Sequence, residues 1–416
     1  MLASMPSITA QPGAQPERPT ASPLGTRRAT RAGARLALRW AALRNRCMTE
    51  RYELPGHRLP LFLRFACYLT IGVLVCLVGP SAGYARERTS GKSGADVAAQ
   101  EARLNNEENK PTAGNARVLD HVGLDDTLVE VMAHPAFAGF GRFLFPLNIG
   151  RVVPALTIAE VGRLLPYHRH VDPAMTVKVI NDMIDRINEG KKIFFDVYTQ
   201  QQRSADSSLE STGLFYFQGR PGAPFAVVCP GGGFSYVGSI HEGFPYALEL
   251  SQKGYNAFVL QYRIRDEQTA TRDLAAAVSF ILENASMLEV STTGYSLWGS
   301  SAGARMVANI GSFGLLRFGG REYPGPSTVI MAYTGRAEYS GQDPPTFVVV
   351  SEDDWIVDVA TVERRVEGLR SSGVEVEFHK FRRAGHGFGI GTGTDAAGWI
   401  DDAVRFWEKH ITPGAG

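Results

Sequence analysis

From residue 191 onward, short apolar runs alternate with longer stretches in which apolar residues recur every three or four positions. The short runs predict strands and the longer stretches predict helices. The predicted strands are 192–198, 213–217, 225–229, 257–262, 295–298, 329–333, 346–350 and 374–381. The predicted helices are 246–252, 271–284, 302–310, 359–371 and 399–410. Apolar strands that alternate with helices predict an α/β fold, a mostly parallel sheet with helices on both faces.

The preceding stretch, 118–190, has a helical pattern. Thr157 and Glu160 have the spacing of a capping box, and Asp172 followed by Pro173 is a typical helix start. Gly190 is placed to end the second of these helices. We therefore expect residues 118–190 to form a helical extension that packs on, or caps, a domain at 191–412.

The N-terminal part of the chain has three compositions. Residues 1–47 are rich in Ala, Pro and Arg and are expected to be disordered, and the polar residues 86–117 are expected to be a linker. Between them, in 48–85, basic residues precede an apolar run and small residues follow it, which is typical of a secretory signal peptide. The prediction is an exported protein. The alternative is an uncleaved membrane anchor through 59–79.

Composition and charge exclude only a few classes of function. The chain has 416 residues, of which 44% are hydrophobic and 20% charged, and a net charge of +1, so nothing calls for a nucleic-acid partner. None of the four cysteines has the spacing of a metal site. Cys229 ends a predicted strand, and we interpret it as a small buried side chain rather than a reactive thiol.

The segment Gly299-Ser300-Ser301-Ala302-Gly303 fits the pattern Gly-x-Ser-x-Gly between a predicted strand and a predicted helix. This context is typical of a turn that lifts a nucleophilic serine above the edge of a sheet. The flanking positions lack side chains because the turn is tight. Ser301 is the predicted nucleophile. The N–H of Ala302, at the start of the next helix, is placed to stabilise an oxyanion.

A glycine-rich loop follows the predicted strand 225–229. Its sequence is Pro230-Gly-Gly-Gly-Phe234, and three glycines let backbone N–H groups approach a substrate closely. A loop of this kind after an early strand is typical of an oxyanion loop, with Gly232 and Gly233 as the predicted donors. A phosphate-binding loop is disfavoured because neither Gly-x-Gly-x-x-Gly nor Gly-Lys-Ser/Thr is present.

His386 lies in a second glycine-rich loop, Gly385-His-Gly-Phe-Gly389, after the last predicted strand. A histidine at that place can take the proton of Ser301 and later give it to the leaving group. The triad acid is expected between the serine and the histidine, at a strand end. Asp354 is our choice and Asp353 the alternative, whereas Asp358 is expected to begin the next helix.

Three other histidines are candidate site residues. His168 and His170 form a His-x-His pair, but no third convincing metal ligand accompanies them, so we expect surface or helix-end positions. His241 and Glu242 follow the glycine-rich loop and either line the pocket or simply begin a helix. No metal or organic cofactor is expected.

Taken together, the motifs at 230–234, 299–303, 351–357 and 385–389 resemble those of α/β-hydrolase esterases. The nearest group is that of bacterial acetyl, xylan and feruloyl esterases, which are related to hormone-sensitive-lipase-type carboxylesterases. The resemblance covers about residues 190–412. It implies an acid in a Gly-x-x-Asp-x-x-Val segment, which maps to Asp354 and Val357, with Ser351 in place of the glycine.

Three functions remain open from the sequence. The first is an exported serine esterase that acts on a short-acyl or carbohydrate-linked ester with Ser301, His386 and Asp354. The second is a serine peptidase of the same fold. The third is a non-catalytic binding protein of the cell envelope. An intact triad argues against the third, and neither the acyl nor the alcohol group of a substrate can be read from the sequence.

Overall fold

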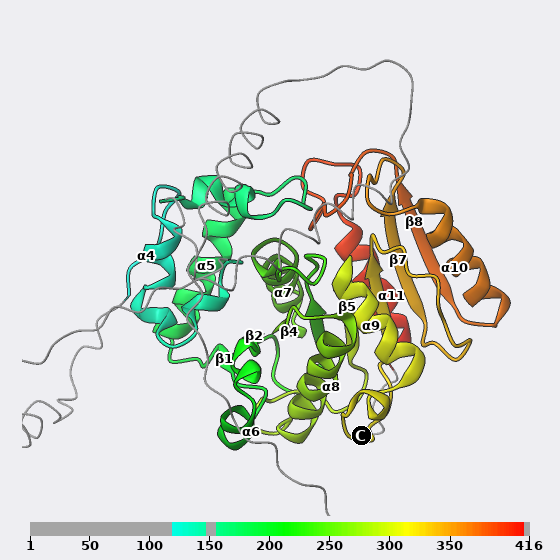
Figure 1. Ribbon diagram of the computed structural model, residues 1–416, viewed down its shortest axis with the longest axis horizontal. Coiled ribbons are helices and arrows are strands. Elements are labelled where there is room, and N and C mark those ends of the chain that lie inside the picture. The colour runs from blue at the N-terminus through cyan, green and yellow to red at the C-terminus, as the bar shows by residue number, and fades with distance from the viewer. Residues whose placement is uncertain (1–118, 147–154, 412–416) are drawn as a thin grey trace, which may run out of the picture. The chain divides into compact units, whose positions relative to one another are not determined.

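A computed structural model of the protein describes residues 119–146 and 155–411. Its centre is a sheet of eight strands in the order β1-β2-β4-β3-β5-β6-β7-β8 (Figure 1). β1 and β2, and β2 and β4, are antiparallel, and the remaining pairs are parallel. The strands are β1 Phe194–Phe195, β2 Gly213–Phe217, β3 Phe225–Cys229, β4 Asn256–Gln261, β5 Ser296–Ser300, β6 Thr328–Ala332, β7 Thr346–Ser351 and β8 Val376–Phe381.

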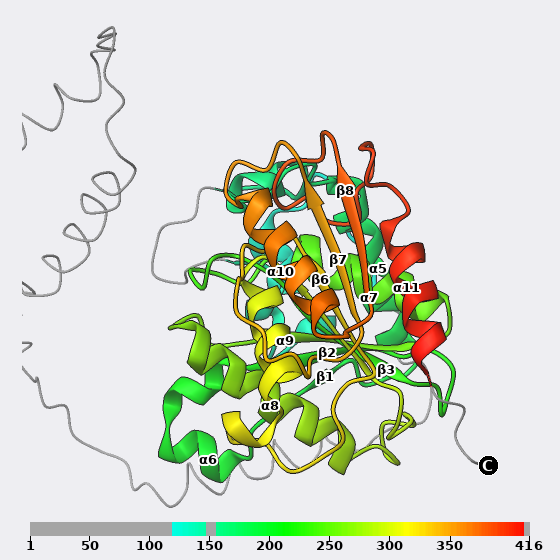
Figure 2. The ribbon, with the colours of Figure 1, turned by 90° about the vertical axis from the view of Figure 1, so that its right-hand side faces the viewer.

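Helices cover both faces of this sheet (Figure 2). They are α4 Leu128–Met132, α5 Pro173–Asn188, α6 Gln200–Ala205, α7 Phe244–Gln252, α8 Glu267–Glu283, α9 Ala302–Phe313, α10 Val359–Ser371 and α11 Trp399–His410. Short 3-10 helices are found at Pro135–Phe137, Gly141–Phe143, Ile158–Leu164, Ser207–Ser211 and Leu316–Phe318, and a π-helical turn is found at Ser239–Gly243.

Each face of the sheet has its own hydrophobic core. Alternate residues of a strand point to opposite faces, so Val228 of β3 packs with α5, α7 and α11, whereas Val227 packs with α8, α9 and α10. The central strands β3 to β7 are buried along their whole length. Strands buried on both faces read as continuous apolar runs, which is why the sequence predicts them well. The architecture is the α/β-hydrolase fold, as expected.

The helical region before the sheet shares one of these cores. Leu128 of α4, Val161 of the 3-10 helix and Ile184 of α5 are buried in the cluster that contains α7 and α11. α5 begins at Pro173, and the side chain of Asp172 accepts a hydrogen bond from the N–H of Ala174, as the sequence predicts. The described part of 118–190 therefore packs against the sheet domain.

Several element boundaries differ from the predictions. α8 begins at Glu267 rather than at 271, because Asp266 caps it by accepting from the N–H of Thr269. α7 begins at Phe244 and follows the π-helical turn, and α6 was not predicted at all. The sequences of α6 and of the first turn of α8 are polar and have no apolar period, and the side chains of Thr199 and Asp266 cap these helix starts.

The predicted tail, signal and linker at 1–47, 48–85 and 86–117 lie outside the described residues, as does the apolar run 59–79. Among the helices of the described ranges, none is long and apolar enough to cross a membrane.

Candidate active site

The candidate site lies at the carboxyl ends of the parallel strands, where α/β sheets commonly place their functional loops. Ser301 follows β5, Asp354 follows β7, and His386 follows β8. The loop at Gly231–Gly233 follows β3. The fold therefore brings together residues that are far apart in the sequence.

Ser301 occupies a strained turn between β5 and α9. Its backbone has φ +49° and ψ −113°, an uncommon conformation for a residue with a side chain. The turn is closed by glycines on both sides. A Cβ atom on Gly299 would lie 2.5 Å from the backbone of Gly303, and one on Gly303 would overlap the carbonyl oxygen of Cys229. The Gly-x-Ser-x-Gly pattern thus has the steric reason that the sequence suggested.

The side chains of Ser301, His386 and Asp354 form a continuous hydrogen-bonded line. Nε2 of His386 lies 3.0 Å from Oγ of Ser301, and Nδ1 of His386 lies 2.8 Å from Oδ2 of Asp354. The side chains of His386 and Asp354 are 2% and 0% exposed, so water does not compete for the bond between them. When the N–H at Nδ1 donates a hydrogen bond to the carboxylate, Nε2 carries a lone pair that can accept the serine proton.

Backbone N–H groups orient Asp354. Its Oδ1 atom accepts hydrogen bonds of 2.8 Å from both Ile356 and Val357, which leaves Oδ2 for His386. The alternative acid, Asp353, points elsewhere, because its Oδ1 accepts from the hydroxyl of Ser351 and from the N–H of Gly385. The bond from Ser351 lowers the pKa of Asp353. Asp358, as expected, caps α10.

The glycine-rich loop lies directly beside the serine. A Cβ atom on Gly231 would lie 2.9 Å from Cβ of Ser301, and Gly232 and Gly233 have φ values of +130° and +62° that favour glycine. In the described part of the chain, the N–H groups of Gly232 and Gly233 have no hydrogen-bond acceptor. The N–H of Ala302 begins α9, where the first N–H groups have no acceptor within the helix.

A cavity of about 430 Å³ opens onto this arrangement. It is lined by Gly233, Phe234, Ser301, Ala302, Arg305, Tyr333, Thr334, Gly335, Ile356, Val357, Asp358 and Thr361. The lining therefore contains both apolar side chains and groups that can bind hydroxyls or charges. Trp298 of β5 is fully buried in the core, whereas Trp355, next to Asp354, is 48% exposed.

His168 contradicts the expectation of a surface position. Its side chain is 2% exposed and lies 3.1 Å from Oε1 of Glu242, whereas His170 is exposed as expected. Glu242 is fully buried and accepts hydrogen bonds from the N–H of Gly231 and the hydroxyl of Tyr333. Although burial alone raises the pKa of Glu242, the adjacent His168 lowers it to about 2.

His241 and Glu242 lie in the π-helical turn behind the glycine-rich loop and do not line the cavity at Ser301. Burial lowers the pKa of His241 to about 4, and its Nε2 lies 2.9 Å from the carbonyl oxygen of Gly387. A neutral imidazole can donate to that carbonyl. Glu242, a charged residue soon after the glycine-rich loop, is the local signal for this buried network. Its partner His168 is far away in the sequence, so no local pattern indicates it.

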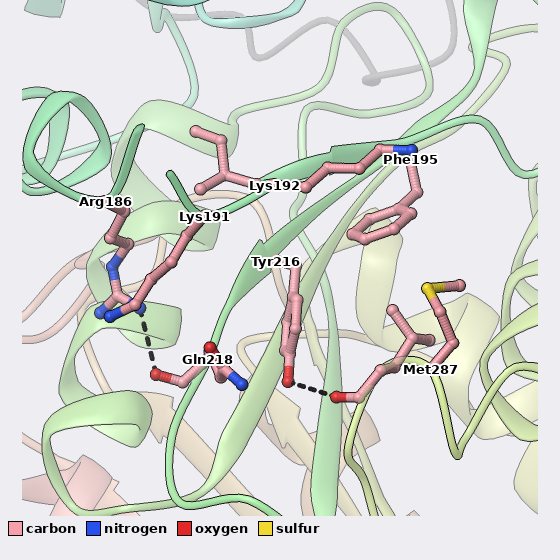
Figure 3. A pocket seen from close by; sticks show the side chains of 9 residues that line it. Arg186, Lys191, Lys192, Phe195, Tyr216, Gln218 and Met287 are labelled. Atoms are coloured by element: carbon pink, nitrogen blue, oxygen red, sulfur yellow. Dashed lines mark hydrogen bonds between the residues drawn. The ribbon is translucent and has the colours of Figure 1, made fainter. Parts of the chain in front are cut away.

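Another cavity, of about 210 Å³, lies elsewhere in the domain, and none of the predicted site residues lines it. Figure 3 shows the side chains that line it. Arg186, Lys191 and Lys192 contribute basic side chains to it. Two of these have partners, since Arg186 pairs with Asp182 and Lys191 pairs with Glu189. In the ranges that the structure covers, no group of three or more His, Cys, Asp or Glu side chains is arranged to hold a metal ion.

Comparison with protein families gives two matches that follow one another along the chain. The BD-FAE model matches residues 218–315, and the prolyl oligopeptidase family model matches residues 324–414. The first segment contains the glycine-rich loop and Ser301, and the second contains Asp354 and His386.

Two curated proteins are similar over part of the chain. An acetylxylan esterase of Xylanibacter ruminicola is 24% identical over 203 residues, which are 41% of this chain and 42% of that protein. Endo-1,4-beta-xylanase B of Butyrivibrio fibrisolvens is 26% identical over 214 residues, which are 42% of this chain and 34% of that protein. The chain thus spans less than half the length of either relative.

Solved structures are also similar. An α/β hydrolase from a Medee basin deep-sea metagenome library is 24% identical with a TM-score of 0.42, and the match covers 48% of this chain and 92% of that one. An acetyl ester-xyloside bifunctional hydrolase from Caldicellulosiruptor lactoaceticus is 19% identical with a TM-score of 0.46, and the match covers 52% and 95%.

Proposed function

We propose that this chain, an ester hydrolase of the α/β-hydrolase superfamily, cleaves a carboxylic ester through a Ser-His-Asp acyl-enzyme mechanism. The observation that supports this proposal is the hydrogen-bonded line from Oγ of Ser301 through the imidazole of His386 to Asp354. In the first step Oγ attacks the ester carbonyl carbon while Nε2 of His386 takes its proton. Asp354 holds the imidazole and stabilises the imidazolium.

The tetrahedral intermediate carries a negative oxygen. The N–H groups of Gly232, Gly233 and Ala302 are the proposed donors to it, because they have no acceptor in the described residues, and Gly233 and Ala302 line the same cavity as Ser301. His386 then protonates the leaving alcohol oxygen as the ester C–O bond breaks. A water, deprotonated by His386, attacks the acyl-serine and releases the acid, and the proton returns to Oγ.

The proposed substrate is a short-acyl or carbohydrate-linked ester. A cavity of about 430 Å³ can hold a small acyl group, and Arg305, Asp358 and Thr361 at its wall can bind a hydroxyl-rich alcohol. One of the similar curated proteins is an acetylxylan esterase. The test is acetate release from acetylated xylo-oligosaccharides alongside hydrolysis of p-nitrophenyl acetate, with Ser301→Ala as the control. If wild-type protein and Ser301→Ala release acetate equally, the proposal is wrong.

A serine peptidase is the second candidate, because the prolyl oligopeptidase family model matches the segment with Asp354 and His386. The two activities share a nucleophile and differ in the leaving group, which is an amine in a peptidase. Parallel assays of p-nitrophenyl acetate and aminoacyl p-nitroanilides separate them. We expect the ester to be cleaved much faster.

Export is proposed from the sequence pattern at 48–85, where basic residues, an apolar run and small residues follow one another. N-terminal sequencing of the protein recovered from a secreting host tests this proposal. A new N-terminus near Ala85 is expected. An intact N-terminus in the membrane fraction would instead indicate an anchor through 59–79.

A further inference from the structure

The segment Tyr167–Arg169 comes from the helical region before the sheet and touches both catalytic loops. The ring of Tyr167 stacks on Tyr236 with centroids 5.7 Å apart, and it lies 3.2 Å from where a Cβ atom on Gly233 would be. The N–H of Arg169 donates to the carbonyl oxygen of Gly387 at 3.1 Å. This segment therefore bridges the oxyanion loop and the loop that contains His386.

Between these two loops lies the buried carboxylate of Glu242. It accepts from the N–H of Gly231 at 2.6 Å and from the hydroxyl of Tyr333 at 2.8 Å, and Nε2 of His168 lies 3.1 Å away. A buried carboxylate costs several kcal/mol unless it is paired and hydrogen-bonded. These three neighbours supply that pairing.

The proposed mechanism leaves Glu242 without a chemical step. Its hydrogen-bond partners in the described residues do not include Ser301 or His386. Two of its partners nevertheless contact these two residues. Gly231 abuts Ser301, and the ring of Tyr333 packs against the imidazole of His386 with centroids 5.2 Å apart. The carboxylate of Glu242 therefore connects Gly231, which precedes the proposed oxyanion donors, with Tyr333, which packs against the proposed catalytic base.

The glycine-rich loop needs such an anchor. Fixing the backbone of one residue costs about 1–2 kcal/mol, and glycine has the most freedom to lose. Oxyanion donors must be held within about 0.5 Å of their working positions. The bond from Gly231 to Glu242 fixes the N–H that immediately precedes Gly232 and Gly233.

We propose that Glu242 is a positioning residue for the oxyanion loop and that His168, from outside the sheet domain, is the partner that keeps it in place. This inference rests on the proposed esterase function. The region 118–190 then contributes directly to the working geometry of the active site, in addition to its contribution to the core.

The test compares Glu242→Gln and His168→Asn with His170→Asn, all in the full chain. His170 is the matched control because it belongs to the same His-x-His pair but is exposed, and asparagine tolerates its positive φ of 55°. Loss of one oxyanion donor lowers kcat about 100- to 1,000-fold. Because the loop is displaced rather than lost, kcat should fall about 10- to 100-fold in the first two variants, with KM changed less than about threefold.

A second readout separates positioning from a merely structural role. A trifluoromethyl ketone forms a tetrahedral adduct with the serine and places an oxyanion in the loop, so its affinity should weaken by the same factor as kcat/KM falls. A loss of fold stability alone would lower the unfolding temperature and leave the inhibitor affinity of the folded fraction unchanged. If Glu242→Gln does not fold, His168→Asn carries the test.

The proposal is overturned if folded Glu242→Gln and His168→Asn keep the kcat and inhibitor affinity of His170→Asn. It is also overturned if their losses appear only in KM. Failure of the esterase proposal is distinguishable, since wild-type protein would then hydrolyse no ester in the same assays.

Discussion

Oδ2 of Asp354 lies 2.8 Å from Nδ1 of His386, although the preceding residue of the same loop, Asp353, is also a carboxylate. The difference arises from the local turn. The N–H groups of Ile356 and Val357 hold one oxygen of Asp354 and turn the other toward the imidazole, whereas Asp353 is held by Ser351 and Gly385.

This geometry predicts unequal effects of the same substitution at the two positions. Asp354→Asn removes the acceptor that fixes the histidine tautomer, so kcat should fall about 10,000-fold. Asp353→Asn alters only a support of the loop and should cost less than about tenfold. Steady-state kinetics with p-nitrophenyl acetate check both. Equal losses would contradict the assignment of Asp354 as the triad acid.

The tight turn at the serine predicts a large stability effect at Gly303. A Cβ atom there would overlap the carbonyl oxygen of Cys229, so Gly303→Ala should lower the free energy of unfolding by about 3 kcal/mol. Gly325→Ala is the control, because nothing lies within 4 Å of its Cβ position, and it should change stability by less than about 0.5 kcal/mol. Urea unfolding measures both, and similar midpoints would refute the steric argument.

Because His241 is buried, we predict that the stability of the fold decreases in acid. Its pKa is lowered from 6.5 to about 4, first by burial, so the unfolded chain takes up a proton in this range that the folded chain does not. Stability therefore falls as pH falls from 6.5 to 4, by up to about 3 kcal/mol. The lowered pKa of Glu242 adds a further loss between pH 4.5 and 2.

The variant His241→Gln isolates the first of these effects. Glutamine can donate to the carbonyl oxygen of Gly387 but does not titrate, so its unfolding free energy should depend less steeply on pH between 6.5 and 4 than that of the wild type. Urea midpoints across this range provide the measurement. Parallel curves for the two proteins would show that His241 is not the titrating group.

We predict that the thiol of Cys229 is unreactive in the folded protein. It is fully buried at the end of β3, and burial raises its pKa, which disfavours the reactive thiolate. Iodoacetamide should leave Cys229 unmodified in the folded protein and alkylate it in urea, as peptide mapping can follow. Rapid alkylation of Cys229 in the folded protein, with loss of activity, would revive the thiol hypothesis.

The central strands and the loops of the proposed active site could be predicted because their signals are local. β3 and β7 are apolar runs because both of their faces are buried, and glycines stand at Gly299 and Gly303 because backbone atoms leave no room there. The sequence favours Asp354 over Asp353, and the resemblance to known esterases supports that choice. The turn that points the two side chains in different directions is a three-dimensional feature.

Contacts between segments that are distant in the sequence could not be predicted. His168 is followed in the sequence by the polar residues Arg169 and His170, which is typical of a surface segment. Its ring is nevertheless buried against Glu242. The environment of a polar residue depends on which segments the fold brings to it, and no local period records that. The start of α8 differs, because a local contact, the cap by Asp266, sets the boundary there without any apolar period.

Ser301 is the proposed activated nucleophile, and a fluorophosphonate probe tests this role most directly, because such probes react covalently with serines that a base activates. The full-length protein is incubated with the probe, and the labelled peptide is mapped by mass spectrometry. We predict labelling at Ser301 that is abolished in Ser301→Ala and strongly reduced in His386→Ala. A folded wild-type protein that stays unlabelled, or is labelled at another residue, would contradict the account and favour a binding role.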